Sequence, residues 1–201
     1  MHRRDFMKTT ALFGAAMAGA SAIAANTDAA NRSELNGLGA EGEHFASRTG
    51  LWDLTETIWR SAGAEPETST DLVAERFMMG AVLQEIIRPA DDTSRHDVKR
   101  TDLLTFNRVE GRWQYVSFDT RDPVGLMPAW SRNAGDGKSL DLDFYPIAAW
   151  NDGGSGGILM RMRQVTSFDG PDSDTKDQYF TLADGNGREW LGHRYSFKRR
   201  K

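Results

Sequence analysis

Short segments in which apolar and polar residues alternate follow one another along most of the chain, and this pattern constrains the fold more than any other feature of the sequence. In the first segment Trp52, Leu54 and Ile58 share one side of an extended chain, and a period of two is typical of a β-strand with one buried face. Turn residues separate the segments, and no helical periodicity intervenes. We predict ten strands, at residues 51–60, 71–77, 81–88, 99–108, 112–120, 127–132, 140–147, 157–168, 177–183 and 188–198.

The short links between these segments favour antiparallel pairing, because parallel strands need a long crossover connection. Parallel α/β folds are therefore disfavoured. An antiparallel meander of about ten strands removes its exposed edges most simply by closing into an up-and-down β-barrel. A two-sheet sandwich is the alternative. The 201 residues suffice for one such all-β domain with a substantial core.

A twin-arginine element, RRDFMK at residues 3–8, stands near the start of the sequence. An uncharged run at residues 9–25 follows it and contains an A-x-A site at residues 22–24. These features predict a twin-arginine signal peptide over residues 1–24, and hence a periplasmic or secreted protein. The run is rich in Ala and Gly and shorter than the ~20 strongly apolar residues of a membrane span, so we expect no stable membrane insertion after cleavage.

Residues 25–42 are rich in small and polar residues without an apolar face, which predicts a flexible tether. We expect the barrel domain at residues 43–201, beginning with one helical turn at residues 43–48.

Loss of residues 1–24 removes three basic residues and one acidic residue, so the formal net charge falls from -4 to -6. An acidic chain has no electrostatic reason to bind nucleic acid. The absence of cysteine excludes disulfides and cysteine nucleophiles.

The segment Gly-Leu-Trp at residues 50–52 resembles the G-x-W opening of lipocalin-type (calycin) barrels. This resemblance implies that the indole of Trp52 closes one end of the barrel and that a basic residue of the last strand, Arg194 or Lys198, covers it. Over residues 44–119 the chain more closely resembles a bacterial calycin-like family, the domain of unknown function 1579 family. The matching motifs are His44-Phe45, Gly50-x-Trp52, Trp59, Arg76-Phe77-Met78-Met79-Gly80, Leu103-Leu104-Thr105-Phe106-Asn107, Trp113-Gln114-Tyr115-Val116 and Asp119.

The family resemblance implies the barrel fold and carries no established activity. Haem-binding nitrobindin-like proteins are more distant relatives of the same barrel type, and in them a histidine that reaches the cavity ligates the iron. This chain lacks their extended glycine-rich first-strand signature. The sequence therefore leaves the cofactor unknown.

The last predicted strand places Leu191, His193, Tyr195 and Phe197 on one face, and their apolar character predicts that this face looks into the barrel. His193 would then be an interior imidazole. Such a group can ligate haem iron, shuttle a proton or hydrogen-bond the polar end of a ligand. The alternative is a core histidine whose nitrogen atoms are bonded to neighbouring protein groups.

Glu56 shares the inward face of Trp52, where an unpaired carboxylate is costly. A β-bulge or an internal arginine would explain it, and Arg76, Arg161 and Arg163 are the candidate partners. Arg161 and Arg163 alternate with two methionines along one predicted strand, so only one of the two sets can face inward. We expect the methionines to do so. The predicted inward pair is Met160 and Met162.

Two classes of function follow. The first is an exported barrel that binds a small hydrophobic or amphipathic molecule in its lumen. The second is an isomerase or lyase in which Glu56 and His193 transfer protons, and haem binding through His193 is a further alternative. The candidate ligand-binding residues are Trp52, Glu56, Met160, Met162, His193, Tyr195 and Phe197.

Two Asp-rich segments, at residues 169–174 and 184–187, place oxygen ligands at short spacing. They lack the ordered twelve-residue loop and the terminal Glu of a typical calcium site. We therefore predict turns at both places.

Overall fold

The computed structural model describes residues 37–149, 157–185 and 187–201, and Leu38–Lys201 forms one compact unit. The predicted signal peptide at residues 1–24 lies outside the described residues, and so do residues 25–36 of the predicted tether. The described elements are α2 (Gly39–Ala46), β1 (Gly50–Ile58), β2 (Glu67–Met79), β3 (Val82–Pro89), β4 (Arg100–Asn107), β5 (Arg112–Asp119), β6 (Leu126–Ser131), β7 (Ser139–Phe144), β8 (Ile147–Ala149), β9 (Ile158–Gly170), β10 (Ser173–Leu182) and β11 (Trp190–Arg199).

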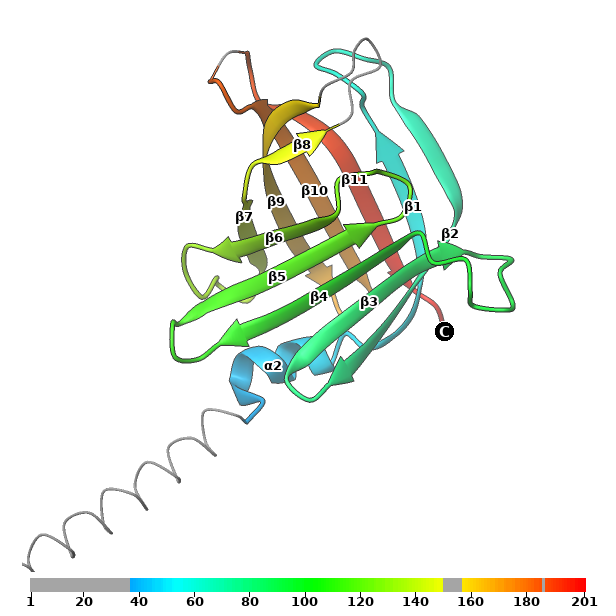
Figure 1. The fold of residues 1–201 in the computed structure, drawn as a ribbon. Helices are drawn as coiled ribbons and strands as arrows, with labels where there is room; N and C mark the ends of the chain where they lie inside the picture. The colour runs from blue at the N-terminus through cyan, green and yellow to red at the C-terminus, as the bar shows by residue number, and fades with distance from the viewer. Residues whose placement is uncertain (1–36, 150–156, 186) are drawn as a thin grey trace, which may run out of the picture. The chain divides into compact units, whose positions relative to one another are not determined.

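Ten antiparallel strands close into a barrel, and β8 is an additional short strand paired with β9 (Figure 1). Each barrel strand pairs with its neighbours in sequence, apart from the β7–β9 step that passes over β8, and β11 returns to β1. The predicted up-and-down β-barrel is confirmed. All ten predicted strands are present, but β2 begins at Glu67 and β10 at Ser173, each four residues earlier than expected.

The helix α2 lies across one end of the barrel (Figure 1). It begins at Gly39, so it includes the last four residues predicted to belong to the tether and starts before the helical turn expected at residues 43–48. Phe45 fixes it in place, because its ring packs against Trp113 at 4.8 Å and against Phe168 at 5.6 Å between ring centroids. Apolar contact of this kind closes the barrel at the α2 end.

Trp52 is fully buried near the same end, as the G-x-W resemblance implies. Its indole Nε1 donates to the backbone oxygen of Arg48 at 3.1 Å. Guanidinium groups of Arg76 and Arg199 each lie 4.5 Å from the centre of the ring system. The basic residue of the last strand that covers Trp52 is therefore Arg199, and the prediction of Arg194 or Lys198 was wrong. Arg194 instead binds Asp177 on the outer surface.

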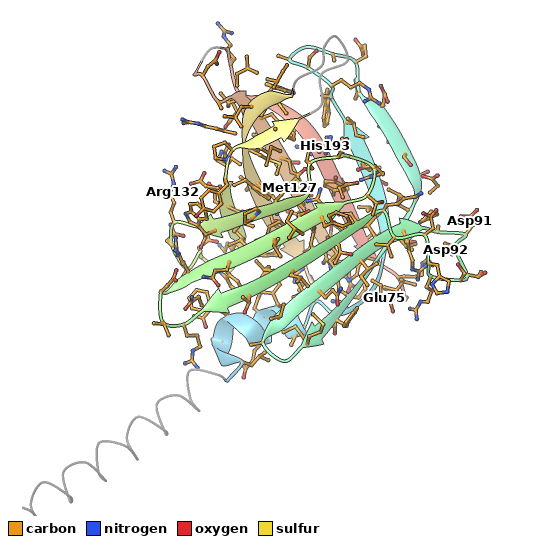
Figure 2. All side chains as sticks on the ribbon, viewed as in Figure 1. Glu75, Asp91, Asp92, Met127, Arg132 and His193 are labelled. Atoms are coloured by element: carbon orange, nitrogen blue, oxygen red, sulfur yellow. The ribbon has the colours of Figure 1, made fainter. Side chains whose placement is uncertain are left out.

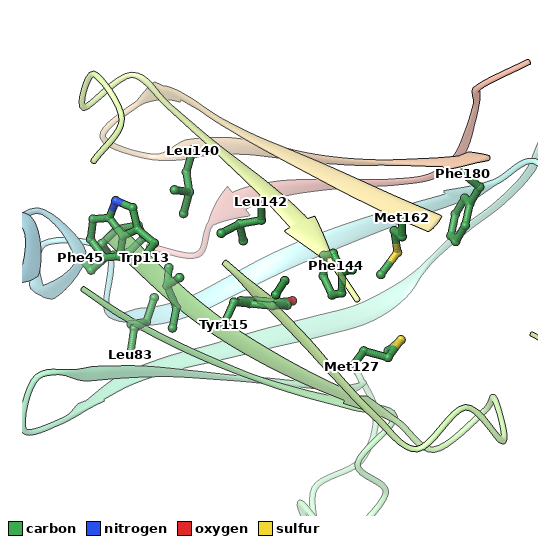
Figure 3. Close-up of a cluster of buried hydrophobic side chains, with 12 residues drawn as sticks. Phe45, Leu83, Trp113, Tyr115, Met127, Leu140, Leu142, Phe144, Met162 and Phe180 are labelled. Atoms are coloured by element: carbon green, nitrogen blue, oxygen red, sulfur yellow. The ribbon is translucent and has the colours of Figure 1, made fainter. Parts of the chain in front are cut away.

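Two clusters of buried apolar side chains line the interior of the barrel. The larger extends from Phe45 and Trp113, next to α2, to Met127, Met162 and Phe180 toward the other end (Figure 3). The smaller comes from β1, β2, β3 and β11. Its members are Trp52, Leu54, Leu72, Ala74, Ile87, Tyr195 and Phe197.

Ten charged side chains of alternating sign run through the interior as a connected series, which we call the ionic chain. Nine of them have side chains at most 8% exposed. The widest of its nine contacts, 3.9 Å, joins Arg100 to Asp119. Five cations face five anions, so the series has no net formal charge. In order of contact, the residues are Arg48, Asp174, Arg76, Glu85, Lys176, Asp102, Arg100, Asp119, Arg121 and Glu56.

Lys176 occupies the middle of the ionic chain. Its Nζ lies 2.6 Å from Glu85 Oε1 and 2.7 Å from Asp102 Oδ2. Burial alone would lower the pKa of Lys176, but attraction by the two carboxylates outweighs it and raises that pKa above its ordinary value. A cavity of only about 40 Å³ remains beside these groups. The middle of the lumen is therefore filled, and its cations are already neutralised.

Replacing Lys176 by Met should destabilise the fold by about 3–5 kcal/mol, because two buried carboxylates lose a shared cation. The control is Arg132→Met, which removes a cation from an ion pair whose arginine side chain is 83% exposed. That change should stay within about 0.5 kcal/mol. Urea unfolding followed by circular dichroism measures both, and equal losses in the two variants would contradict the structural role of the ionic chain.

Candidate functional site

A cavity of about 270 Å³ opens at the end of the barrel that carries β8, away from α2. We call it the mouth pocket. Figure 2 shows two of its residues, Met127 and His193, toward this end. The lining residues come from strand ends and adjoining loops. They are Ile58, Trp59, Arg60, Arg100, Asp119, Asp122, Val124, Met127, Ile147, Met160, Met162, Gln178, Phe180, Trp190 and His193.

The wall of the mouth pocket is mostly apolar. Met162 is buried at 4% exposure, and Met160 packs against the larger apolar cluster. The prediction that these methionines face inward is confirmed. The alternating arginines point outward, where Arg163 pairs with Glu189 at 3.1 Å. Flexible thioether side chains can adapt to ligands of different shape.

The floor of the mouth pocket is polar. Gln178 donates from Nε2 to Gln164 Oε1 at 2.9 Å across β9 and β10. His193 lies beside it, with Nδ1 3.4 Å from the hydroxyl oxygen of Tyr195. Arg100 and Asp119 of the ionic chain complete the floor. An apolar wall over a polar floor suits a molecule with an apolar body and one polar end.

A β-bulge at Gly192 changes which residues of β11 face this pocket. The register between β10 and β11 shifts there, since Gln178 is opposite His193 while Tyr179 is opposite Leu191. Beyond the bulge, Trp190 packs against the apolar cluster and lines the pocket. Strict alternation predicted Leu191 in that position, and this prediction was wrong. Glycine in a strand was the available signal for a bulge.

His193 is neutral at physiological pH. Burial lowers its pKa to about 4, and the opposing attraction of Glu56 compensates only in part. The positive charge of Arg100 lowers the pKa further. A neutral imidazole can donate one hydrogen bond and accept another.

Glu56 faces the interior, but it is not available as a base. Arg121 donates from both terminal nitrogens to the two carboxylate oxygens, at 2.6 and 2.9 Å. The same guanidinium also binds Asp119. The arginine partner anticipated from the sequence is therefore Arg121, a loop residue. The three candidates named in the sequence analysis have other surroundings, and Arg76 pairs with Glu85 and Asp174.

The other predicted site residues lie away from the mouth pocket. Trp52 belongs to the α2 end, as described above. Phe197 is 2% exposed, with the Lys176 ammonium 5.4 Å from its ring centroid. Tyr195 is fully buried between the ionic chain and His193. The structure therefore brings three predicted residues, Met160, Met162 and His193, into the pocket.

Within the described residues, no three His, Asp or Glu side chains are grouped so that they could hold a metal ion. No helix in the same residues is both long enough and apolar enough to cross a bilayer. Of the two segments predicted as turns, 169–174 contains a turn at residues 171–172, and a turn at residues 183–184 includes the start of the segment 184–187. Asp174 lies inside β10, in the ionic chain, so the predicted turn ends earlier than expected.

No protein-family model matches the chain, and no curated protein sequence matches it. The fold is similar to that in the crystal structure of Rv2717c from M. tuberculosis, with a TM-score of 0.52 and 11% sequence identity. The similarity covers 82% of this chain and 99% of that one. At this identity the similarity concerns the fold alone. Membership of the domain of unknown function 1579 family stays a prediction.

Protonation of His193 should make the fold less stable in acid. Because the folded-state pKa of about 4 is below the unfolded value of 6.5, stability is complete above pH 6.5 and is lost as the pH falls toward 4. Between pH 7.5 and 4.5 this residue should account for roughly 2–3 kcal/mol. His193→Gln should lose correspondingly less stability over that range in urea unfolding. Equal pH dependence in both proteins would contradict a buried, neutral His193.

Proposed function

We propose that this chain is an exported β-barrel protein that binds a small amphipathic molecule in the mouth pocket. The observation that supports this most strongly is the combination of an apolar methionine and aromatic wall with a polar floor around His193. A volume of about 270 Å³ is near the lower end of the usual range for ligand pockets. It therefore suits a compact ligand rather than a long one.

The filled lumen supports this location for the ligand. Most of the predicted lumen-binding residues are packed in the core, and every cation of the ionic chain is paired with a carboxylate. A ligand in the middle of the barrel would have to break such pairs, which is costly in a buried site. A ligand can occupy the mouth pocket without breaking these ion pairs.

The proton-transfer alternative loses one of its two groups. A general base must lie within reach of the substrate. Glu56 is bound at both carboxylate oxygens by Arg121 and is not among the residues that line the mouth pocket, so the pairing of Glu56 and His193 as base and acid is not supported.

Haem was the other alternative, with His193 as the iron ligand. The mouth pocket, at about 270 Å³, is smaller than the roughly 300–1,000 Å³ of pockets that enclose a drug-sized ligand. A macrocycle of the size of haem therefore does not fit inside it without movement of the pocket wall.

Export is the second part of the proposal, and it is supported by the twin-arginine element at residues 3–8 and by the A-x-A site at residues 22–24. Protein made with its own signal and purified from the periplasm should have the intact mass of a chain that begins at Ala25. The binding experiment below uses this exported protein.

Filling the mouth pocket with an indole should weaken ligand binding. N-phenyl-1-naphthylamine, an uncharged fluorescent probe, should bind the wild type with increased emission, and Met160→Trp should weaken that binding at least roughly tenfold by occupying the apolar volume. The matched control is Arg161→Trp, which adds an indole at the next position, on the outer face of β9. Equal binding by both variants, or no binding by the wild type, would contradict the proposed site.

A further inference from the structure

Trp190 and His193 of β11 both line the mouth pocket, each with an N–H group for which the described part of the chain supplies no acceptor, and we propose that these two groups select an uncharged carbonyl compound as the ligand. This inference rests on the proposed function, since it names the chemical class of ligand for the same pocket. The first group is the indole Nε1 of Trp190. It is buried and has no hydrogen-bond partner in the described part of the chain. A buried donor that has given up its bond to water is costly unless another acceptor replaces it.

The second group is Nε2 of His193. Tyr195 determines which nitrogen of the imidazole carries the proton. Its hydroxyl oxygen accepts from Arg100 at 3.2 Å and lies 3.4 Å from His193 Nδ1. In the proposed arrangement the hydroxyl donates its proton to Nδ1, and the neutral ring then carries its own proton on Nε2. His193 is therefore a second donor on the floor of the pocket.

Trp190 and His193 both pack against Phe180, which lines the mouth pocket with them. Its ring centroid lies 5.8 Å from that of Trp190 and 5.6 Å from that of His193. Gly192 makes this packing possible, because a Cβ atom there would lie 2.2 Å from Phe180 Cδ2. The bulge thus lets both rings pack against one aromatic side chain of the pocket wall.

The charges around the pocket favour an uncharged acceptor over a carboxylate. Two arginines line the pocket, and both are paired: Arg100 with Asp102 and Asp119, and Arg60 with Glu67. At the rim, burial and the charge of Asp119 raise the pKa of Asp122, which shows that a further negative charge is disfavoured there. A ketone, ester, amide or quinone oxygen meets both requirements, because it accepts hydrogen bonds without a formal charge.

Three naphthalene compounds of similar size test this selection: 2-acetylnaphthalene, 2-naphthoate and 2-ethylnaphthalene. Each competes with N-phenyl-1-naphthylamine for the wild-type protein at pH 7.5. We expect the acetyl compound to displace the probe at a roughly tenfold lower concentration than either of the others. If all three compete equally, or if the naphthoate competes best, the inference is overturned and the proposed function stands. If the probe does not bind at all, the proposed function fails as well.

Variants assign the selection to the two donors. Trp190→Phe and His193→Phe should each reduce the preference for the acetyl over the ethyl compound by roughly threefold. Trp130→Phe is the control, since that indole lies on the outer face next to Tyr145 and outside the mouth pocket. An unchanged preference in both Trp190→Phe and His193→Phe overturns the inference. Circular dichroism confirms that each variant is folded.

The imidazole can also be examined without substitution. In ¹⁵N NMR spectra of the wild type, the Nε2 atom of His193 should carry the proton and Nδ1 should not. The opposite tautomer would remove the second donor and overturn the inference, even if the Phe variants failed to fold.

Discussion

The barrel depends on the pairing of charges that its strands direct inward. A ten-stranded barrel encloses more space than a single layer of apolar side chains fills, and here the remaining space holds the ionic chain. Each of its members would be costly alone in that environment. The strands β2, β3, β4 and β10 must therefore keep the register that brings Arg76, Glu85, Asp102 and Lys176 together. This requirement ties together strands that are distant in sequence.

The ionic chain also connects two ends of the barrel that differ in structure. At the α2 end, Arg48 joins the helix segment to Asp174, and the ring of Trp52 is held between two arginines. At the other end, the series finishes at Arg121 and Glu56. The mouth pocket lies at this end, lined by His193, Met160 and Met162. The proposed ligand site is therefore confined to one end, over a floor that is fixed by ion pairs.

Alternation and turn residues were sufficient to predict the barrel and the positions of its strands, because each follows from local sequence. They also identified His193, Met160 and Met162. Other features depend on contacts between distant segments. Nothing local marks Lys176 as an interior residue, because its two partners come from β3 and β4. The Asp-rich sequence around Asp174 is typical of a turn, although that carboxylate binds Arg48 and Arg76. One inserted glycine in β11 was enough to exchange Leu191 for Trp190.

The most direct test of this account is a ¹H–¹⁵N NMR titration of the indole N–H groups with 2-acetylnaphthalene. Trp52 and Trp113 are internal references, because their indole nitrogens donate to backbone oxygens near the α2 end. If the ligand enters the mouth pocket, the Trp190 resonance should move as its indole N–H gains an acceptor, while the Trp52 and Trp113 resonances stay in place. Movement of Trp52 or Trp113 with an unchanged Trp190 would show that the ligand enters the filled part of the barrel, and would contradict the account.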